Sequence, residues 1–275
     1  MDSLVSTAWL AEHLGEIDIV VVDASWHMPA SGRSGHAEYL EAHIPGARFL
    51  DIDAVSDRAN PAPHMLPSAG DFGAAMEALG VGRSDRIVVY DNSPTRTAAR
   101  GWFMLRHFGA DRVAILDGGF QKWIAERRPT EAGEAGHRAA HFDDRERPDE
   151  VVAKSDVLAC GILLDARGQG RFEGSEVDPR PGVAPGHIPG ARNLPFGMLY
   201  RDDGTFRELE EIRALFKNAG IDPAQPFTAT CGSGVTANSL IFAAHLLGAG
   251  GNRLYDGSWS EWGADPASPK ALGPA

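Results

Sequence analysis

The hexapeptide HIPGAR stands at His43–Arg48 and returns unchanged at His187–Arg192. Each copy follows an apolar, β-branched stretch that ends in Asp-Ala, at Ile19–Ala24 and Ile162–Ala166. Further matches follow downstream: residues 86–91 match the stretch that leads into Cys231, and residues 116–123 match residues 254–262. Four matched blocks in the same order, at a nearly constant offset, predict two tandem homologous domains.

Within each copy, short aliphatic stretches alternate with helical ones such as Phe72–Leu79 and Leu209–Ala219. This alternation predicts an α/β fold in which each domain has a parallel sheet with helices on both faces. We place the first domain at residues 1–128, a polar, charged linker at 129–150 and the second domain at 151–275. From Asp265 onward the sequence predicts a loose tail.

The composition is that of a soluble globular protein, since 43% of its 275 residues are hydrophobic and 23% are charged. A formal net charge of −12 argues against nucleic acid or an anionic membrane as a partner. No apolar run has the length of a membrane span, and the N-terminus lacks the features of a secretory signal. Two cysteines, Cys160 and Cys231, form no disulfide framework, so we expect a reducing, cytoplasmic setting. Cys160 is expected to be a buried, unreactive thiol.

The most distinctive motif is CGSGVT at residues 231–236, between an apolar stretch and a helical one. Cys231 is therefore expected at the carboxyl end of a strand, among loop N–H groups and near the positive end of a helix dipole. Such surroundings favour the thiolate, which is the nucleophilic form. The first copy has Asp91 at this place, so we expect it to be non-catalytic. His43 and His187 occur in both copies, which favours a structural role.

A tandem pair with a loop cysteine only in the second copy resembles the sulfurtransferase family that includes rhodanese. The loop itself is similar to the form found in the family's 3-mercaptopyruvate sulfurtransferases. Relatives that use thiosulfate usually carry basic residues directly after the cysteine, whereas Gly232 and Ser233 are neutral. The resemblance implies that the remaining loop residues contribute to substrate binding, namely Gly232, Gly234, Val235 and Thr236.

Four further residues are candidates through the same resemblance. The segments around Arg171 and Arg180 are similar to the family's substrate-binding stretch, and paired guanidinium groups can hold the carboxylate and carbonyl of a 2-oxo acid. The segments around Asp53 and His64 resemble the stretch that supplies an acid and a histidine to the active cleft. The resemblance implies a relay in which Asp53 fixes His64 and His64 orients the hydroxyl of Ser233.

The function implied is transfer of sulfur from 3-mercaptopyruvate to a thiol, thioredoxin or cyanide, through a persulfide on Cys231 and with release of pyruvate. No metal or organic cofactor is expected. The nearest alternative is a thiosulfate sulfurtransferase. A cysteine phosphatase would need an arginine six positions after the cysteine, where the chain has Ala237. A non-enzymatic persulfide carrier or scaffold would have no need of the arginine pair.

Overall fold

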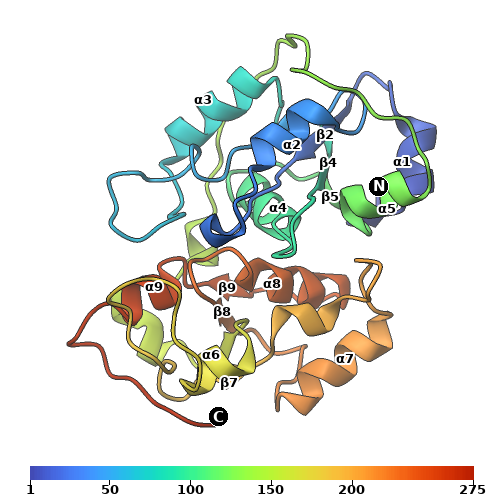
Figure 1. The fold of residues 1–275 in the computed structure, drawn as a ribbon. Helices are drawn as coiled ribbons and strands as arrows, with labels where there is room; N and C mark the ends of the chain where they lie inside the picture. The colour runs from blue at the N-terminus through green and yellow to red at the C-terminus, as the bar shows by residue number, and fades with distance from the viewer. The chain divides into compact units, whose positions relative to one another are not determined.

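The chain forms two compact units in the computed structural model, which describes all 275 residues (Figure 1). Both units are discontinuous in sequence. Unit 1 contains residues 1–57, 66–147 and 201–206, and unit 2 contains residues 58–65, 148–200 and 207–275.

The sheet of unit 1 is fully parallel and has the strand order β1-β5-β4-β2-β3. Its central strands β2 and β4 are in register from Ile19 opposite Arg86 to Asp23 opposite Tyr90. Both strands are runs of buried β-branched residues, which is typical of a sheet covered on both faces. The strands are β1 (Leu4–Val5), β2 (Ile19–Asp23), β3 (Arg48–Phe49), β4 (Arg86–Tyr90) and β5 (Val113–Leu116).

Helices cover the two faces of this sheet. One face carries a core cluster to which α1, α2 and α5 contribute Leu10, Tyr39 and Trp123. On the other face Gly101 of α4 lies close to Val89 of β4, and α3 adds Phe72, which stacks on Phe108. The helices are α1 (Thr7–His13), α2 (Gly35–Glu41), α3 (Ala69–Leu79), α4 (Ala98–His107), α5 (Gly119–Ala125) and the short 3-10 helix η1 (Pro29–Ser31).

Unit 2 repeats this plan with four parallel strands in the order β7-β6-β8-β9. Phe172, Trp259 and Trp262 form a core cluster on the side of α6 and α9. The strands are β6 (Leu163–Asp165), β7 (Arg192–Asn193), β8 (Thr228–Thr230) and β9 (Arg253–Leu254). The helices are α6 (Gln169–Glu173), α7 (Leu209–Asn218), α8 (Ala237–Leu246), α9 (Ser258–Trp262) and the 3-10 helices η2 (Pro148–Glu150), η3 (Lys154–Ala159) and η4 (Phe196–Leu199). The predicted α/β fold with parallel sheets and flanking helices is confirmed.

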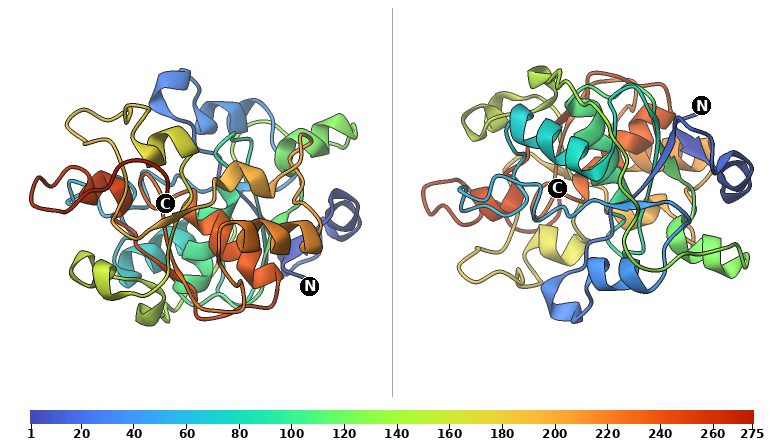
Figure 2. Two further views of the ribbon diagram at one scale, coloured as in Figure 1. Left: turned by 90° about the horizontal axis from the view of Figure 1, so that it is seen from below. Right: turned by 90° about the horizontal axis from the view of Figure 1, so that it is seen from above.

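The carboxyl-terminal segment is not the loose tail that its sequence predicted. Ala271 and His187 exchange two backbone hydrogen bonds of 2.9 Å, and the Gly273 N–H donates to Glu173 O over 2.9 Å. The segment therefore runs beside α6, as the views of Figure 2 also show. The prediction was wrong because the backbone groups of this proline-rich stretch find partners in unit 2.

The two repeated histidines lie where a structural role requires them. His43 is buried and its Nδ1 bonds Tyr39 O over 2.8 Å, while the Nδ1 of buried His187 bonds Phe172 O over 2.9 Å. Cys160, in contrast, is only half-buried, because it ends η3 at the margin of the core rather than inside it. No helix combines the length and the apolar character that crossing a membrane requires.

Candidate active site

Cys231 follows the last residue of β8, and α8 begins six residues later at Ala237. This is the strand–loop–helix arrangement that the sequence predicts. The cysteine is 1% exposed and is therefore buried. Gly234 adopts a left-handed φ of 71°, and a Cβ atom there would lie 2.5 Å from Asp256 Oδ1. The loop therefore requires glycine at this position.

Ser258, at the start of α9, holds the two ends of this loop together. Its Oγ accepts the N–H groups of Cys231 and Gly234, each over 3.1 Å, and donates to Tyr255 O over 2.8 Å. The same Oγ lies 4.0 Å from Cys231 Sγ. Ser258 is fully buried and has a left-handed φ of 48°, which is rare for a residue other than glycine and is concentrated at functional sites. The sequence places Ser258 only in the repeated block at residues 254–262, and it was not predicted as a site residue.

The remaining loop donors point to an anion. No hydrogen bond within the protein uses the backbone N–H groups of Gly232, Ser233, Val235 or Thr236. Buried N–H groups are almost always paired, so a run of free donors beside a buried sulfur indicates a ligand that accepts them.

Arg171 and Arg180 converge on the same loop. Arg180 Nη1 donates to Gly232 O over 2.6 Å, and a Cβ atom on Gly232 would lie 2.4 Å from Arg180 Nη2 and 3.2 Å from Arg171 Nη2. Buried Asp178 holds both side chains: Arg171 Nη2 donates to its Oδ2 over 2.7 Å, and Arg180 Nε lies 3.7 Å from its Oδ1. Asp178 was missed as a site residue, although it lies two positions before Arg180.

The charge of this cluster is not balanced. Two guanidinium groups share one carboxylate, and Arg171 Nε is buried without a hydrogen-bond partner. Burial lowers the pKa of Arg180; Asp178 opposes this effect, and Arg171 adds to it. Desolvated, like-charged neighbours favour the binding of a further anion, because it would restore charge balance and complete their hydrogen bonds.

His64 and Ser233 are brought together by the fold. His64 Nδ1 lies in hydrogen-bond contact with Ser233 Oγ at 2.9 Å, and the two residues are 8% and 9% exposed. The segment Arg58–Met65 belongs to unit 2, together with the cysteine loop. His64 itself has a left-handed φ of 63°. The hydroxyl of Ser233, two positions after the cysteine, thus has an acid–base group within reach.

Asp53 has a different environment. It is exposed in unit 1, and its Oδ2 accepts the indole N–H of Trp26 over 2.8 Å. Its own backbone N–H donates to Asp51 Oδ1 over 3.0 Å. Its contribution to the site remains a prediction from the resemblance.

The matching loop of unit 1 is filled by its own side chain. The Asp91 carboxylate accepts the N–H groups of Ser93 over 2.8 Å and Ala98 over 2.7 Å. Burial raises the pKa of this aspartate, and the two backbone bonds counteract that rise. Two donors of this loop are thus occupied by the protein's own carboxylate. That the first copy is non-catalytic stays a prediction.

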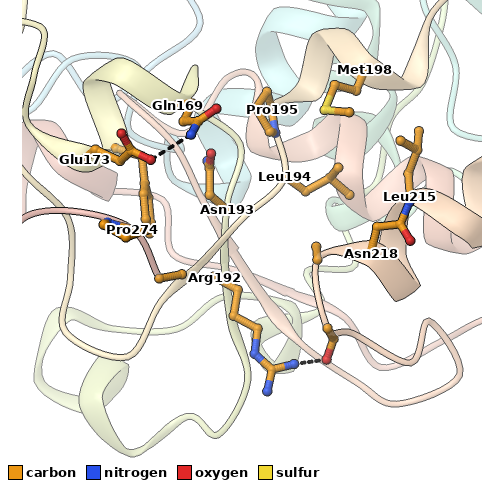
Figure 3. A pocket seen from close by; sticks show the side chains of 14 residues that line it. Gln169, Glu173, Arg192, Asn193, Leu194, Pro195, Met198, Leu215, Asn218 and Pro274 are labelled. Carbon is orange, nitrogen blue, oxygen red and sulfur yellow. Dashed lines mark hydrogen bonds between the residues drawn. The ribbon is translucent and has the colours of Figure 1, made fainter.

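The cavity of about 540 Å³ in unit 2 lies elsewhere (Figure 3), since none of its lining residues belongs to the cysteine loop or to the arginine pair. No three His, Cys, Asp or Glu side chains are grouped in a way that could hold a metal ion.

Comparison with known proteins explains this arrangement. The model of the rhodanese-like domain matches the chain twice, at residues 6–126 and 148–265. The chain belongs to the rhodanese family. One relative is mouse 3-mercaptopyruvate sulfurtransferase, which is 40% identical over 94% of this chain and 91% of its own length. Another is chicken thiosulfate sulfurtransferase, which is 38% identical over 94% of this chain and 93% of its own length. The crystal structure of SseA from Escherichia coli, which its authors describe among the 3-mercaptopyruvate enzymes, matches with a TM-score of 0.86 and 38% identity over 95% of this chain and all of that one.

Proposed function

We propose that this rhodanese-family sulfurtransferase takes sulfur from 3-mercaptopyruvate and carries it as a persulfide on Cys231. The observation that carries the proposal is the convergence of two guanidinium groups on Gly232, directly beside a buried cysteine. A 2-oxo acid offers a carboxylate and a carbonyl oxygen, and the Arg171–Arg180 pair offers forked donors with an excess of positive charge. The neutral side chains at positions 232 and 233 add no counter-charge for a doubly charged donor.

Donor binding places the sulfur towards the cysteine. The donor carboxylate and carbonyl accept hydrogen bonds from Arg171 and Arg180, and Arg180 is already fixed to Gly232 O over 2.6 Å. Asp178 keeps both arginines in place while leaving one positive charge for the substrate. Binding of this kind lowers the entropic cost of the reaction by orienting the two sulfur atoms.

The transfer step breaks one bond and forms one. The Cys231 thiolate attacks the donor sulfur, an S–S bond forms, and the S–C bond breaks with its electron pair going to carbon. The leaving group is the enolate of pyruvate, which takes a proton to become pyruvate. Ser233 and His64, in contact at 2.9 Å, are proposed to stabilise and protonate this enolate.

Asp53 is proposed as the carboxylate that orients His64, on the resemblance of its segment alone. The free N–H groups of the loop are proposed to hold the persulfide anion until an acceptor arrives. A thiol, a thioredoxin-like protein or cyanide then attacks the outer sulfur and releases the Cys231 thiolate. Gly232, Gly234, Val235 and Thr236 act through the backbone in this scheme.

A second candidate function is transfer from thiosulfate, because the chain is also 38% identical to chicken thiosulfate sulfurtransferase. Steady-state rates with the two donors, measured with cyanide as acceptor, distinguish the candidates. We expect kcat/KM with 3-mercaptopyruvate to exceed that with thiosulfate by at least about a hundredfold, since loss of two charge-assisted contacts costs about 3 kcal/mol or more. A higher value with thiosulfate would overturn the donor assignment.

A mass measurement tests the persulfide separately. Exposure to the donor without an acceptor is expected to add the mass of one sulfur atom to the peptide that contains Cys231. Cys160 is the internal control, because it is half-buried and therefore also reachable by a small reagent. Added mass on the Cys160 peptide alone would contradict the mechanism.

A further inference from the structure

The four free N–H groups of the cysteine loop belong to peptide groups whose carbonyls are all held. The chain contains no cis peptide bond. In a trans peptide group the N–H points away from the C=O of the preceding residue, and the group is planar. A partner that holds the carbonyl therefore also fixes the direction of the N–H on the other side. The carbonyls in question are those of Cys231, Gly232, Gly234 and Val235.

The first two of these carbonyls are held by the backbone of α9. The Trp259 N–H donates to Cys231 O over 3.0 Å. The Ser260 N–H donates to Gly232 O over 2.8 Å, and Arg180 Nη1 adds a second bond to the same oxygen. Because the bonds from α9 are main-chain bonds, they depend on where the helix starts rather than on which side chains it carries.

The other two carbonyls share one side chain, that of Asn238. Its Nδ2 donates to Gly234 O over 2.7 Å and to Val235 O over 2.9 Å. The backbone N–H of Asn238 also reaches Val235 O, but over 3.3 Å. The N–H groups on the opposite side of these two peptides are those of Val235 and Thr236, and both are free. One amide group thus sets the direction of two of the four donors.

The surroundings of Asn238 do not by themselves call for a polar residue. It is the second residue of α8, in which every residue from Ala237 to Ala244 is buried. Its Oδ1 is buried and has no hydrogen-bond partner. The two carbonyl contacts fix the orientation of the amide, because the reverse orientation would place Oδ1 against two carbonyl oxygens. An unpaired buried oxygen is costly, so stability alone does not explain an asparagine here.

We propose that Asn238 is a positioning residue for sulfur transfer, which directs the N–H groups of Val235 and Thr236 towards the sulfur that Cys231 receives. In this role it complements Ser258, whose Oγ accepts the N–H groups of Cys231 and Gly234. The inference rests on the persulfide of the proposed function.

The charge that these donors meet follows from the balance of the transfer step. The electron pair of the Cys231 thiolate forms the S–S bond, and the pair of the S–C bond goes to carbon. Overall the thiol proton of the donor ends on the methyl group of pyruvate, so the transferred sulfur becomes the anionic end of the persulfide. N–H groups whose direction is set beforehand stabilise this charge as it develops.

This role predicts a particular kinetic signature. The donor molecule is bound by the arginine pair, and neither Arg171 nor Arg180 forms a hydrogen bond with Asn238. Loss of the Asn238 contacts is therefore expected to lower kcat and to leave KM for 3-mercaptopyruvate nearly unchanged.

Two variants of equal shape separate the hydrogen-bond donor from the volume of the side chain. A threonine hydroxyl in a helix can donate to the carbonyl three or four positions earlier, which here belongs to Val235 or Gly234. Asn238→Thr therefore keeps a donor, whereas Asn238→Val does not. With cyanide as acceptor, Asn238→Val should lower kcat at least about tenfold, and Asn238→Thr should lower it less than about threefold. KM should stay within about twofold of the parent value in both variants.

A second measurement follows the sulfur itself. Each variant is exposed to 3-mercaptopyruvate without an acceptor, and the fraction of the Cys231 peptide that has gained one sulfur atom is measured by mass over time. Asn238→Val should load at least about tenfold more slowly than Asn238→Thr. Ser239→Ala is the matched control, because it removes the buried acceptor of the Tyr200 hydroxyl at the next position of α8. It should reduce stability in denaturant titration without slowing the loading.

Equal loading rates in Asn238→Val and Asn238→Thr would overturn the proposal, and so would an equal slowing in Ser239→Ala. If denaturant titration shows that the β-branched pair is unfolded, Asn238→Ser and Asn238→Ala make the same comparison with smaller side chains. The proposed function fails in a different way: the parent protein itself would then gain no sulfur on Cys231, and the inference would fall with it.

Discussion

His64 Nδ1 lies 2.9 Å from Ser233 Oγ, although 169 positions separate the two residues in sequence. Both side chains are nearly buried, and the histidine adopts a left-handed backbone conformation. A backbone conformation of this kind persists only where the surrounding structure compensates for its cost. The pair therefore has the geometry of an acid–base unit next to the proposed nucleophile.

The first prediction concerns this pair. Ser233→Ala and His64→Asn should each reduce kcat with 3-mercaptopyruvate by about tenfold to a hundredfold, because each removes a group that handles the proton of the leaving enolate. The double variant should be little worse than either single variant, since the two groups act as a unit. Ser260→Ala is the matched control, because its Oγ bonds only Gly257 O. Multiplicative losses in the double variant would mean that the two side chains act independently.

The second prediction concerns the arginine pair. Arg171→Lys and Arg180→Lys keep the charge but lose the planar fork, so each should reduce kcat/KM for the oxo-acid donor by about tenfold to a hundredfold. Loss of the contact to the carboxylate should appear mainly in KM, whereas loss of the contact to the carbonyl should also lower kcat, because that oxygen takes up the charge of the enolate. Arg192→Lys, in the same unit but on β7, should leave both constants unchanged. Full efficiency in both site variants would remove the support for a 2-oxo acid as substrate.

The third prediction concerns Gly232. A Cβ atom at this position would lie 2.4 Å from Arg180 Nη2, so Gly232→Ala should displace that side chain and raise KM for 3-mercaptopyruvate severalfold. The double variant Gly232→Arg with Ser233→Lys also adds two positive charges, and its turnover of thiosulfate should rise. Added salt should weaken this gain if the loop is open to solvent. A double variant that still prefers 3-mercaptopyruvate would show that loop charge does not set donor choice.

The fourth prediction concerns Ser258. Ser258→Ala leaves the buried N–H groups of Cys231 and Gly234 without their common acceptor. The free energy of unfolding should fall by about 2–4 kcal/mol, since an unpaired buried donor costs about 1–3 kcal/mol. Denaturant titration measures this loss. Ser258→Gly removes the same bonds but relieves the left-handed φ of 48°, so it should destabilise less than the alanine variant. Equal losses in both variants would show that the backbone conformation carries no strain.

The fifth prediction concerns pH. Burial raises the pKa of Asp23 from 3.8 to about 6, although the Ser25 N–H bonds its carboxylate over 2.9 Å. Because the folded state holds the proton more tightly, the stability contributed by Asp23 is complete below about pH 4 and is lost as pH rises through about 6. Asp23→Asn should therefore be more stable than the parent protein at pH 7, by about 3 kcal/mol, and equally stable near pH 4.

Asp18 supplies a control of opposite sign for that measurement. Its hydrogen bond from Arg86 lowers the pKa of this aspartate, so its contribution is present at neutral pH and is lost on acidification. Asp18→Asn should therefore be less stable than the parent protein at neutral pH and should have a flatter acid limb, with a profile above pH 6 that lies below that of the parent and parallel to it. A profile of the Asp23 variant that runs parallel to that of the parent protein would contradict the assigned titration.

The sequence by itself determined the tandem architecture and the place of the cysteine. Residues 43–48 are repeated at residues 187–192, and the stretches around both copies show strand and helix periodicity. Both signals depend on residues close together in sequence, so they can be recognised in a single sequence. The strand–glycine loop–helix pattern around Cys231 is local for the same reason, because it depends on backbone conformations that a few neighbouring residues impose. Arg171 and Arg180 were found by resemblance of short segments rather than by physical necessity.

Tertiary structure decided which distant groups meet. The role of Ser258 in the loop could not be predicted, because it depends on α9 starting beside the end of β8. The role of Asp178 could not be predicted either, because it depends on one buried carboxylate facing two guanidinium groups. The chain end was predicted to be loose because proline-rich sequence lacks periodicity, yet its backbone pairs with His187 and Glu173. The cavity of about 540 Å³ in unit 2 likewise follows from packing, since residues of α6, β7 and α7 come together to line it. Local propensity fixes which elements form, but hydrogen bonds and cavities between elements depend on the close packing that brings them together.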